Sequence, residues 1–326
     1  MDKPIFILGC TKSGTTLMRN LFDGHPDLFV VPFESHFFQN TGRGIEYKYR
    51  RTIPKKLSLE EQKQGLIDWI EFCNVRDNPI ADGFSQNKLN VEAARSMILD
   101  ADVKEERDLA DLYVKAIYTA VYEKPIPMEL NYVEKSVENA EMSTVWKRLY
   151  PNARFVHILR NPYSNLVAMR KYGSHNRGGG FPRLQKPLLA MQNSYYWLYR
   201  NMREIPGYQV VLYDDLMKDT EATMKSVAKA MGIEFKESLL QPSTFGQAWG
   251  GNSLSGKSFK GVSSRNLNVW KDEITSLETD LVNHYFKHVL EDFGFEIHQA
   301  NGRKLIPIRG ESAKVWLFNR TVKYYL

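Results

Sequence analysis

A loop of small residues near the start of the chain has the composition and position of a phosphate-binding cradle. It follows an apolar run at residues 5–8, which indicates a buried strand, and it precedes a helical pattern of apolar residues. Small residues let the backbone curve, so that consecutive N–H groups and the helix N-terminus face an anion. The residues predicted to bind this anion are Thr11, Lys12, Ser13, Gly14, Thr15 and Thr16.

The position of the lysine separates this loop from the standard P-loop. Gly9 and Gly14 have the P-loop spacing, but Thr15 and Thr16 stand where the motif requires Lys followed by Ser or Thr. The lysine of this loop, Lys12, lies inside it. We therefore expect a phosphate-containing ligand that differs from an ordinary nucleoside triphosphate.

Charged side chains follow three other predicted strands. Glu34 comes shortly after an apolar run at 28–31, Lys135 follows 130–134, and Arg160 follows 155–159. Because parallel strands end at one edge of a sheet, where ligands bind, we expect these side chains to share a site with the loop. A carboxylate at Glu34 could accept a proton from a hydroxyl group, with His36 as the alternative base. The guanidinium of Arg160 is suited to bidentate phosphate binding.

The order of the elements predicts an α/β fold. Strands alternate with helices along most of the chain, which indicates a P-loop-like, three-layer fold with a central parallel sheet flanked by helices. A fifth strand is expected at 209–213, and long helices are expected at 184–203 and 272–292. Residues 40–128 interrupt the alternation as a mostly helical insertion, which begins with a basic, aromatic loop at 42–56.

Length and composition favour one domain. The 326 residues contain 43% hydrophobic residues, and no linker divides them, so we expect a single domain over 1–326. Two cysteines, Cys10 and Cys73, provide neither a disulfide framework nor a metal site. The sequence shows no signal peptide and no apolar run long enough to span a membrane, so we expect a soluble, cytoplasmic protein.

The net charge of +6 favours acidic ligands. Basic residues cluster at 43–56, 170–183 and 257–265, in loops that lack the interleaved aromatic residues of single-strand binders. We therefore expect no nucleic-acid polymer as a partner. No metal motif stands out either: His284 and His288 are four apart, but no Glu follows the first as the zincin motif requires.

Several motifs together resemble the sulfotransferases that use 3′-phosphoadenosine 5′-phosphosulfate (PAPS), most closely their bacterial and tyrosylprotein-type branch. The loop at 12–17 resembles the family's 5′-phosphosulfate loop, and the strand, Arg-Asn-Pro and helix at 155–169 resemble its 3′-phosphate element. Further matching segments are His25-Pro26, 34–38, Tyr213-Asp214-Asp215-Leu216 and, more weakly, 261–270.

This resemblance implies roles for particular residues. The activity would be transfer of a sulfuryl group from PAPS to a hydroxyl acceptor, with adenosine 3′,5′-bisphosphate as the product and no metal. Glu34 would act as base, Lys12 would neutralise the leaving group, and Lys135 would contact the sulfuryl group. Arg160 would bind the 3′-phosphate. Ser263, Ser264 and Arg265 would bind the nucleotide as part of a lid, and residues 255–260 are either part of that lid or a disordered loop.

The chain departs from the family pattern at one position. The family places a serine eight residues after the arginine, for the 3′-phosphate, and this chain has Ala168 there. Ser164 lies one helical turn earlier and is the expected substitute. Arg170 and Lys171 are other sources of positive charge for the 3′-phosphate.

Two alternative functions remain at this stage. One is a P-loop-type nucleotide kinase or NTPase, and the other is a non-catalytic binder of sulfated or phosphorylated glycans. The acceptor is also open: the insertion follows Glu34 directly, so we expect it to cover the acceptor site. Its basic, aromatic start (Arg43, Tyr47, Lys48, Tyr49, Arg50 and Arg51) favours an anionic or sugar-like acceptor. The sequence is compatible with a homodimer.

Overall fold

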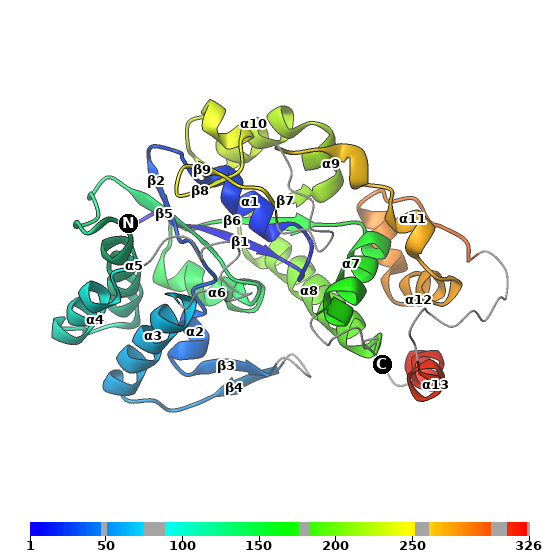
Figure 1. The fold of residues 1–326 in the computed structure, drawn as a ribbon, viewed down its shortest axis with the longest axis horizontal. Helices are drawn as coiled ribbons and strands as arrows, with labels where there is room; N and C mark the ends of the chain where they lie inside the picture. Colours follow the sequence, from blue (N-terminus) through cyan, green and yellow to red (C-terminus); the bar gives the residue numbers. More distant parts are fainter. Residues whose placement is uncertain (47–50, 75–88, 176–182, 252–260, 301–311, 325–326) are drawn as a thin grey trace.

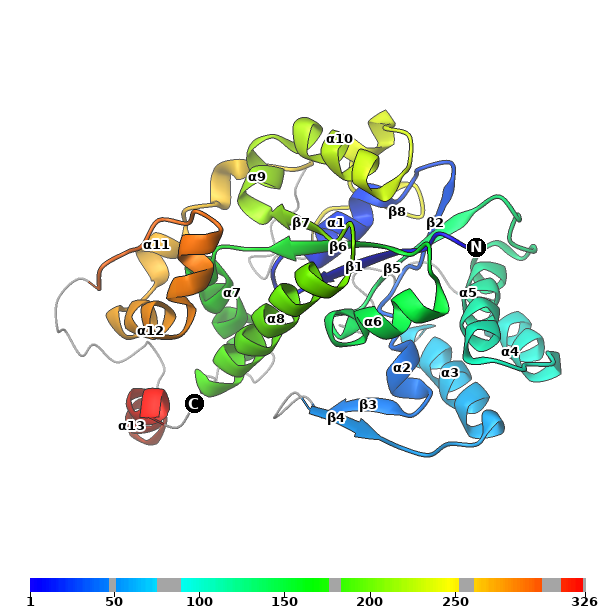
Figure 2. The same ribbon diagram turned by 180° about the vertical axis from the view of Figure 1, so that it is seen from behind.

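The centre of the molecule is a five-stranded sheet in the order β2-β5-β1-β6-β7 (Figures 1 and 2). The computed structural model describes residues 1–46, 51–74, 89–175, 183–251, 261–300 and 312–324. All neighbouring strands of this sheet are parallel, as predicted. The strands are β1 (Ile5–Gly9), β2 (Leu28–Val30), β5 (Asn131–Lys135), β6 (Arg154–Leu159) and β7 (Gln209–Leu212).

The central strand β1 is buried on both faces, which produces three layers. Ile5 and Ile7 pack into a core formed with α1 (Thr15–Phe22) and α10 (Thr220–Met231). The alternate residue Phe6 faces the opposite side, where its ring stacks on Trp146 of α6 (Asn139–Leu149) at 4.5 Å between centroids. Alternate residues of a strand point to opposite faces, so an all-apolar strand requires helices on both. The predicted fold class is confirmed.

A further core lies at the β6–β7 end of the sheet. It joins α7 (Pro162–His175), α8 (Gln185–Glu204) and α12 (Ser276–Asp292). The single helix expected at 272–292 is wrong, because α11 (Trp270–Glu273) ends before α12 begins. Thr275 starts the new helix: its side chain accepts from the N–H of Glu278, whose carboxylate accepts from the N–H of Thr275. This capping box starts the second helix.

The insertion contains a β-hairpin that the sequence analysis missed. A loop was expected at 42–56, but β3 (Arg43–Glu46) and β4 (Arg51–Pro54) pair antiparallel there. Three helices follow, with a shorter one, α2 (Phe37–Asn40), before the hairpin. They are α3 (Leu59–Asn74), α4 (Val91–Asp100) and α5 (Glu106–Tyr122), and their apolar faces join the core on the Phe6 side of the sheet.

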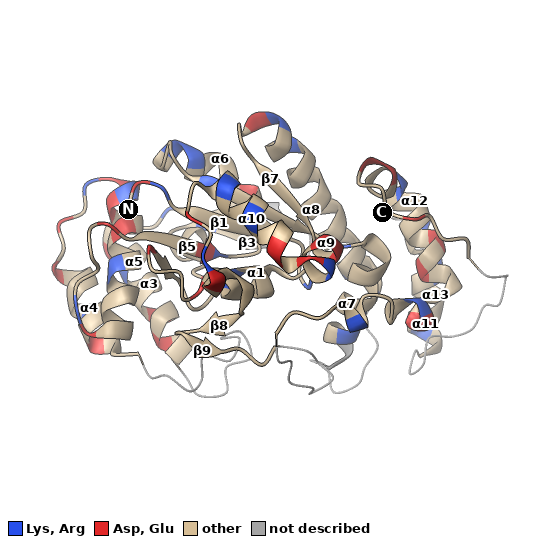
Figure 3. Ribbon diagram, turned by 90° about the horizontal axis from the view of Figure 1, so that it is seen from above, with Lys and Arg blue, Asp and Glu red and all other residues tan. Residues whose placement is uncertain are grey.

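The insertion and the C-terminal helices lie at opposite ends of the molecule in both ribbon views (Figures 1 and 2). α9 (Tyr213–Lys218) begins directly after β7, and a last helix, α13 (Ala313–Thr321), was not predicted. Lys and Arg are interspersed with Asp and Glu along the outer helices seen from above (Figure 3). Among the described residues, no helix is both long and apolar enough to cross a membrane.

Candidate active site

The loop after β1 folds into a tight cradle. Its backbone turns where the N–H of Ser13 donates to the carbonyl of Cys10 at 3.0 Å. Lys12 has φ 65°, a left-handed conformation that costs a non-glycine residue about 1–2 kcal/mol. Such strain concentrates at functional sites, because the surrounding structure must hold it in place.

At both glycines of the loop, a side chain would clash with neighbouring atoms, and the backbone angle also favours glycine. Gly9 has φ 149°, and a Cβ added there would lie 2.6 Å from Ser13 Oγ and 2.7 Å from the Ile158 carbonyl oxygen. Gly14 has φ 107°, and a Cβ there would lie 2.5 Å from the Tyr213 ring. Neither position accommodates a side chain without displacement of its neighbours.

Side chains at and just before the start of helix α7 donate hydrogen bonds to carbonyl groups of the cradle. Asn165 Nδ2 donates to the Thr11 carbonyl, and Arg160 Nη1, just before the helix, donates to the Lys12 carbonyl, both at 2.9 Å. Because these carbonyl oxygens are engaged on the α7 side, the loop can present N–H groups to a ligand.

The cradle has unused donors that suit an anion. The first N–H groups of α1 have no intrahelical acceptor, and the N-cap residue, Gly14, has no side chain to cap them. Ser13 is fully buried, and among the described residues its Oγ has no hydrogen-bond partner. The Thr15 and Thr16 side chains are also buried beside the helix start. These groups fit a phosphate, as the sequence analysis predicted.

Arg160 links the cradle to α7 and α9. Its Nε donates to Ser164 Oγ at 2.9 Å, and its guanidinium carbon lies 4.9 Å from the centroid of the Tyr213 ring. Burial lowers the pKa of Arg160, and the nearby Tyr213 and Asp214 oppose that effect. The guanidinium remains charged, as arginine does in proteins. Ser164, expected to replace the missing serine at 168, therefore lies beside Arg160.

The other basic residues proposed for the 3′-phosphate are engaged elsewhere. Arg170 Nε lies 2.9 Å from Glu278 Oε1, and Lys171 Nζ lies 2.6 Å from Glu273 Oε1. Both pairs join α7 to the α11–α12 segment. The structure thus pairs both side chains with carboxylates at that end of the sheet, and their part in 3′-phosphate binding stays a prediction.

Glu34 and Lys135 are in direct contact. Lys135 Nζ donates to Glu34 Oε1 at 2.5 Å, and the lysine side chain is almost completely buried. The contact arises because β2 pairs with β5, so that the residues after these two strands meet at one edge of the sheet. The sequence placed both residues at this edge, and the structure pairs them.

Helices of the insertion fix the backbone around Glu34. Trp69 Nε1 of α3 donates to the Glu34 carbonyl at 2.8 Å, and the Tyr113 hydroxyl of α5 donates to the Ser35 carbonyl at 3.1 Å. From the sheet side, the N–H of Ser35 donates to Glu134 Oε1 at 3.1 Å. The insertion therefore supports the segment that carries Glu34.

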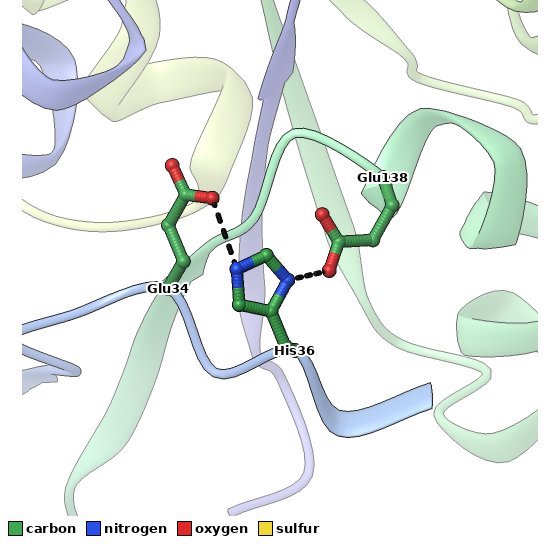
Figure 4. A group of neighbouring side chains, drawn as sticks. All are labelled: Glu34, His36 and Glu138. Carbon is green, nitrogen blue, oxygen red and sulfur yellow. Dashed lines mark hydrogen bonds and ion pairs between the residues drawn. The ribbon is translucent and has the colours of Figure 1, made fainter. Parts of the chain in front are cut away.

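His36 lies between two carboxylates (Figure 4). Its Nε2 is 3.4 Å from Glu34 Oε2, and its Nδ1 contacts Glu138 Oε1 on the other side. Burial alone would lower the pKa of His36, but the charge and hydrogen bond of Glu138 and the charges of Glu34 and Glu134 raise it overall. Burial acts to raise the pKa of Glu138, and the charge and hydrogen bond of His36 outweigh that effect and lower it.

Comparison with known proteins decides the family. A model described as the sulfotransferase family matches residues 4–237, which is more than half of the 326 residues. The chain belongs to the sulfotransferase family.

Relatives and solved structures agree with this assignment. The omega-hydroxy-beta-dihydromenaquinone-9 sulfotransferase Stf3 of Mycobacterium bovis and of Mycobacterium tuberculosis is 23% identical over 255 residues, 71% of this chain. The match spans 63% of the length of these relatives. The sulfotransferase domain of the curacin biosynthetic pathway is 19% identical and has a TM-score of 0.57, with 91% of this chain and 99% of that chain covered.

A second solved structure supports the same fold. The sulfotransferase domain of the Synechococcus PCC 7002 olefin synthase is 18% identical, with a TM-score of 0.55 and coverage of 91% of this chain and 96% of that one. The family relationship and the P-loop-like sulfotransferase fold predicted from the motifs are thus confirmed.

The late serine-containing segment lies next to α9, the helix whose first residue, Tyr213, packs on Arg160. Ser264 and Arg265 belong to a short 3₁₀ turn, η3 (Ser264–Asn266), which packs next to α9. Ser263 caps this turn through its Oγ, which accepts from the Arg265 N–H at 3.4 Å. Residues 255–260 of the expected lid, and Tyr47 to Arg50 of the expected acceptor contact, lie outside the described residues.

Of two hollows in the described structure, the larger lies apart from the predicted contacts. A groove of about 760 Å³ between α8 and α12 is lined by residues such as Tyr196, Arg200 and Tyr285. It includes none of the predicted site residues, so we base the site on the chemistry at the strand ends. A second, small cavity is lined by Thr11, Glu141 and others and adjoins the cradle.

Glu138 is the main site residue that the sequence analysis missed. It lies in the turn between β5 and α6, three residues after Lys135. The available signal was its place after a strand end, where polar residues gather around ligands. The sequence indicated Tyr213 only as part of a motif, whereas in the structure its ring packs on Arg160 and next to Gly14.

Proposed function

We propose that this chain transfers a sulfuryl group from PAPS to a hydroxyl-bearing acceptor. The observation that carries the proposal is the contact between Glu34 and Lys135 at the sheet edge that also holds the cradle, in a chain of the sulfotransferase family. A carboxylate, a lysine and a phosphate cradle together supply a base, charge stabilisation and donor binding.

The cradle would bind the donor through its phosphate groups. Backbone N–H groups of Ser13 to Thr16 and the Thr15 and Thr16 hydroxyls would hold the 5′-phosphate. Arg160, with Ser164 beside it, would hold the 3′-phosphate. The 3₁₀ turn with Ser263, Ser264 and Arg265 packs against α9 and would bind the nucleotide from that side.

The transfer step would proceed in line, with three side chains in defined roles. Glu34 takes the proton of the acceptor hydroxyl, whose oxygen forms a bond to sulfur. The bond between sulfur and the bridging oxygen breaks, and its electrons stay on the phosphate of adenosine 3′,5′-bisphosphate. Lys12 stabilises that leaving oxygen, and Lys135 stabilises the charge on the sulfuryl oxygens.

The family and the insertion support a hydroxyl-bearing acceptor. The name of the mycobacterial relative gives it an omega-hydroxy menaquinone derivative, which is an alcohol. We carry over to this chain only the hydroxyl group. The insertion reaches the Glu34 segment through Trp69 and Tyr113, which supports its placement over the acceptor. Arg43 is paired with Glu106 at 2.9 Å, which weakens its case as a contact for an anionic acceptor.

Ligand binding tests the donor without knowledge of the acceptor. Adenosine 3′,5′-bisphosphate at 1 mM, roughly a hundred times a Kd of about 10 μM, should add about 2.7 kcal/mol to the free energy of unfolding and raise Tm. ATP should have a much smaller effect. A shift with ATP alone would favour the nucleotide kinase or NTPase, and binding of the bisphosphate without transfer to any acceptor would favour a non-catalytic protein.

Transfer of ³⁵S from labelled PAPS tests the reaction. A panel of phenols, tyrosine peptides, oligosaccharides and long-chain alcohols covers the acceptor classes. Lys12→Ala and Glu34→Ala should each lower the rate at least about a hundredfold. Lys229→Ala, on the outer face of α10, is the matched control. Equal rates in all variants would refute the residue roles.

A further inference from the structure

Four charged side chains of alternating sign form a row at the edge of the sheet. Lys135 contacts Glu34 at 2.5 Å, Glu34 lies 3.4 Å from His36, and His36 contacts Glu138. Three of them follow β2 and β5 along the chain, and Glu138 lies in the turn before α6. The ring of His36 is held between the two carboxylates (Figure 4).

We propose that Glu138 is a positioning residue for the base: it keeps His36 doubly protonated, and His36 in turn fixes one oxygen of Glu34. The inference rests on the proposed function, in which Glu34 takes the acceptor proton. The proposal concerns Glu138 and His36 as residues that act through Glu34 and do not themselves exchange protons with the acceptor.

The surroundings of Glu138 give it one strong counter-charge. The Glu138 side chain is 2% exposed, and its ion-pair partner among the described residues is His36. Gln39 Nε2 donates to Glu138 Oε1 at 3.1 Å, and Oε2 has no hydrogen-bond partner in the described part of the chain. A buried carboxylate requires a paired cation, so Glu138 favours the protonated ring.

Two further carboxylates, Glu34 and Glu134, also favour the protonated form of His36, while the amide nitrogen of Gln39 lies 3.1 Å from His36 Nδ1. Glu34 and Glu134 add negative charge, while the positive charge of Lys135 is paired with Glu34. On α3 and α5, burial raises the pKa of Cys73 to about 12 and that of Tyr113 well above its ordinary value, so both groups stay neutral. The ring of Trp69 packs edge-on against His36 at 4.7 Å.

The members of the row form ion pairs with one another. One ligand atom each from Glu34, His36 and Glu138 lie within 4.8 Å of one another, a spacing compatible with a metal ion. However, the two ring nitrogens of His36 face different carboxylates, and the ammonium of Lys135 already neutralises Glu34. The donor atoms therefore point toward one another and not toward a shared centre.

This arrangement assigns different tasks to the two oxygens of Glu34. Oε2 faces the N–H of His36 and stays fixed, while Oε1 faces Lys135. When Lys135 turns to the sulfuryl group of the bound donor, Oε1 becomes the oxygen that receives the acceptor proton. The His36 ring keeps both of its protons throughout, so each broken and formed bond remains as described for the transfer step.

Titration of His36 by NMR tests the charge of the ring without any substrate. The chain has seven histidines, and His36→Gln identifies the resonance. We expect the ring to titrate above its ordinary pKa, and Glu138→Gln should lower that pKa by about 1 to 3, as removal of one adjacent charge does. Glu129→Gln, an exposed position, is the control. A ring that titrates identically in Glu138→Gln and in wild type would overturn the proposal.

Rates of sulfate transfer test the positioning role. Glu138→Gln should lower kcat about tenfold with little change in the KM for PAPS, and should move the alkaline limb of the pH–rate profile to lower pH. In a His36→Gln background, Glu138→Gln should have almost no further effect, because it acts through His36. Additive losses, or an unchanged pH profile of folded Glu138→Gln, would contradict it.

The two proposals fail in different ways. If no acceptor is sulfated but Glu138→Gln moves the His36 titration, the proposed function fails and the charge assignment stands. If transfer occurs and depends on Glu34 but not on Glu138 or His36, the positioning role fails. Stoichiometric Zn²⁺ binding in wild type that is lost in Glu138→Gln would also overturn the proposal, since the row would then be a metal site.

Discussion

The ammonium of Lys135 lies 2.5 Å from the carboxylate of Glu34, across 101 positions of sequence. Parallel pairing of β2 with β5 brings the two residues together, and burial excludes water from the lysine. In the proposed reaction, the base Glu34 is thus held by the same cation that would stabilise the sulfuryl group. Binding of the donor would then exchange one partner of Lys135 for another.

Removal of one member of this pair should cost more than removal of both. Lys135→Met removes the cation that contacts Oε1 of Glu34 and should lower the free energy of unfolding by about 3 kcal/mol. In Lys135→Met/Glu34→Gln, the loss should be smaller than in Lys135→Met alone. Urea denaturation of the four proteins measures the coupling, and simple additivity would show that the pair contributes little.

Gly14→Ala should damage both stability and donor binding. The backbone at φ 107° is strained for alanine, and the new Cβ would lie 2.5 Å from the Tyr213 ring. We expect a loss of at least about 3 kcal/mol, against about 1 kcal/mol for Gly232→Ala, whose φ of 66° is also left-handed but whose Cβ has open space. Thermal denaturation with and without adenosine 3′,5′-bisphosphate compares the two, and equal losses would remove the steric argument.

The face of the Tyr213 ring should stabilise the guanidinium of Arg160 by a cation–π contact. Tyr213→Leu removes a cation–π contact of about 1–2 kcal/mol and should weaken binding of adenosine 3′,5′-bisphosphate about tenfold, while Tyr213→Phe keeps the ring and the affinity. Isothermal titration calorimetry measures both variants. If Phe were as harmful as Leu, the hydroxyl group would be the important part of the side chain.

Ser164 should contribute to discrimination of the 3′-phosphate. Ser164→Ala removes the acceptor of the Arg160 Nε hydrogen bond and should weaken adenosine 3′,5′-bisphosphate by about 1 kcal/mol, with little effect on 5′-AMP. Ala168→Ser, which restores the family's serine, should recover part of the loss. Equal weakening of both nucleotides would place Ser164 in the structure of the loop and not at the 3′-phosphate.

The pair of His36 and Glu138 should make stability depend on pH. His36 has a raised pKa, so its contribution is complete below its ordinary value of 6.5 and is lost as pH rises through the folded-state value. Glu138 has a lowered pKa, so its contribution is present above 4.5 and is lost as pH falls through its folded-state value. The advantage of wild type over His36→Gln should therefore be largest between these limits. Urea denaturation at pH 5.5 and pH 9 tests this, and a pH-independent difference would contradict it.

The sequence predicted the edge of the sheet well because the signals there are local. Apolar runs of a few residues predict the strands, so Glu34, Lys135 and Arg160 could each be assigned to the end of the strand before it. Glu138 could not be recognised in this way. An acid near the first turn of a helix is common for reasons of the helix dipole, and its partner His36 is 102 positions away.

Other errors had signals that were available but weak. The break between α11 and α12 is encoded by Thr275 and Glu278, which form a capping box within an otherwise continuous helical pattern. The hairpin of β3 and β4 was obscured because its strands are short and rich in charge, with Ile45 as a buried residue of β3. Pairing between two such strands depends on their docking against the insertion helices, which local pattern does not reveal.

Two side chains of the insertion donate hydrogen bonds to the backbone of the segment that carries Glu34. Trp69 donates to the Glu34 carbonyl, and Tyr113 donates to the Ser35 carbonyl. These two hydrogen bonds position the backbone at Glu34 and do not involve the Glu34 side chain. If the insertion covers the acceptor as proposed, its outward face can be changed for a new acceptor without a change in the proposed catalytic residues beneath it. For protein engineering, this makes the outward face of the insertion the part to exchange, provided the two anchoring aromatic residues are kept.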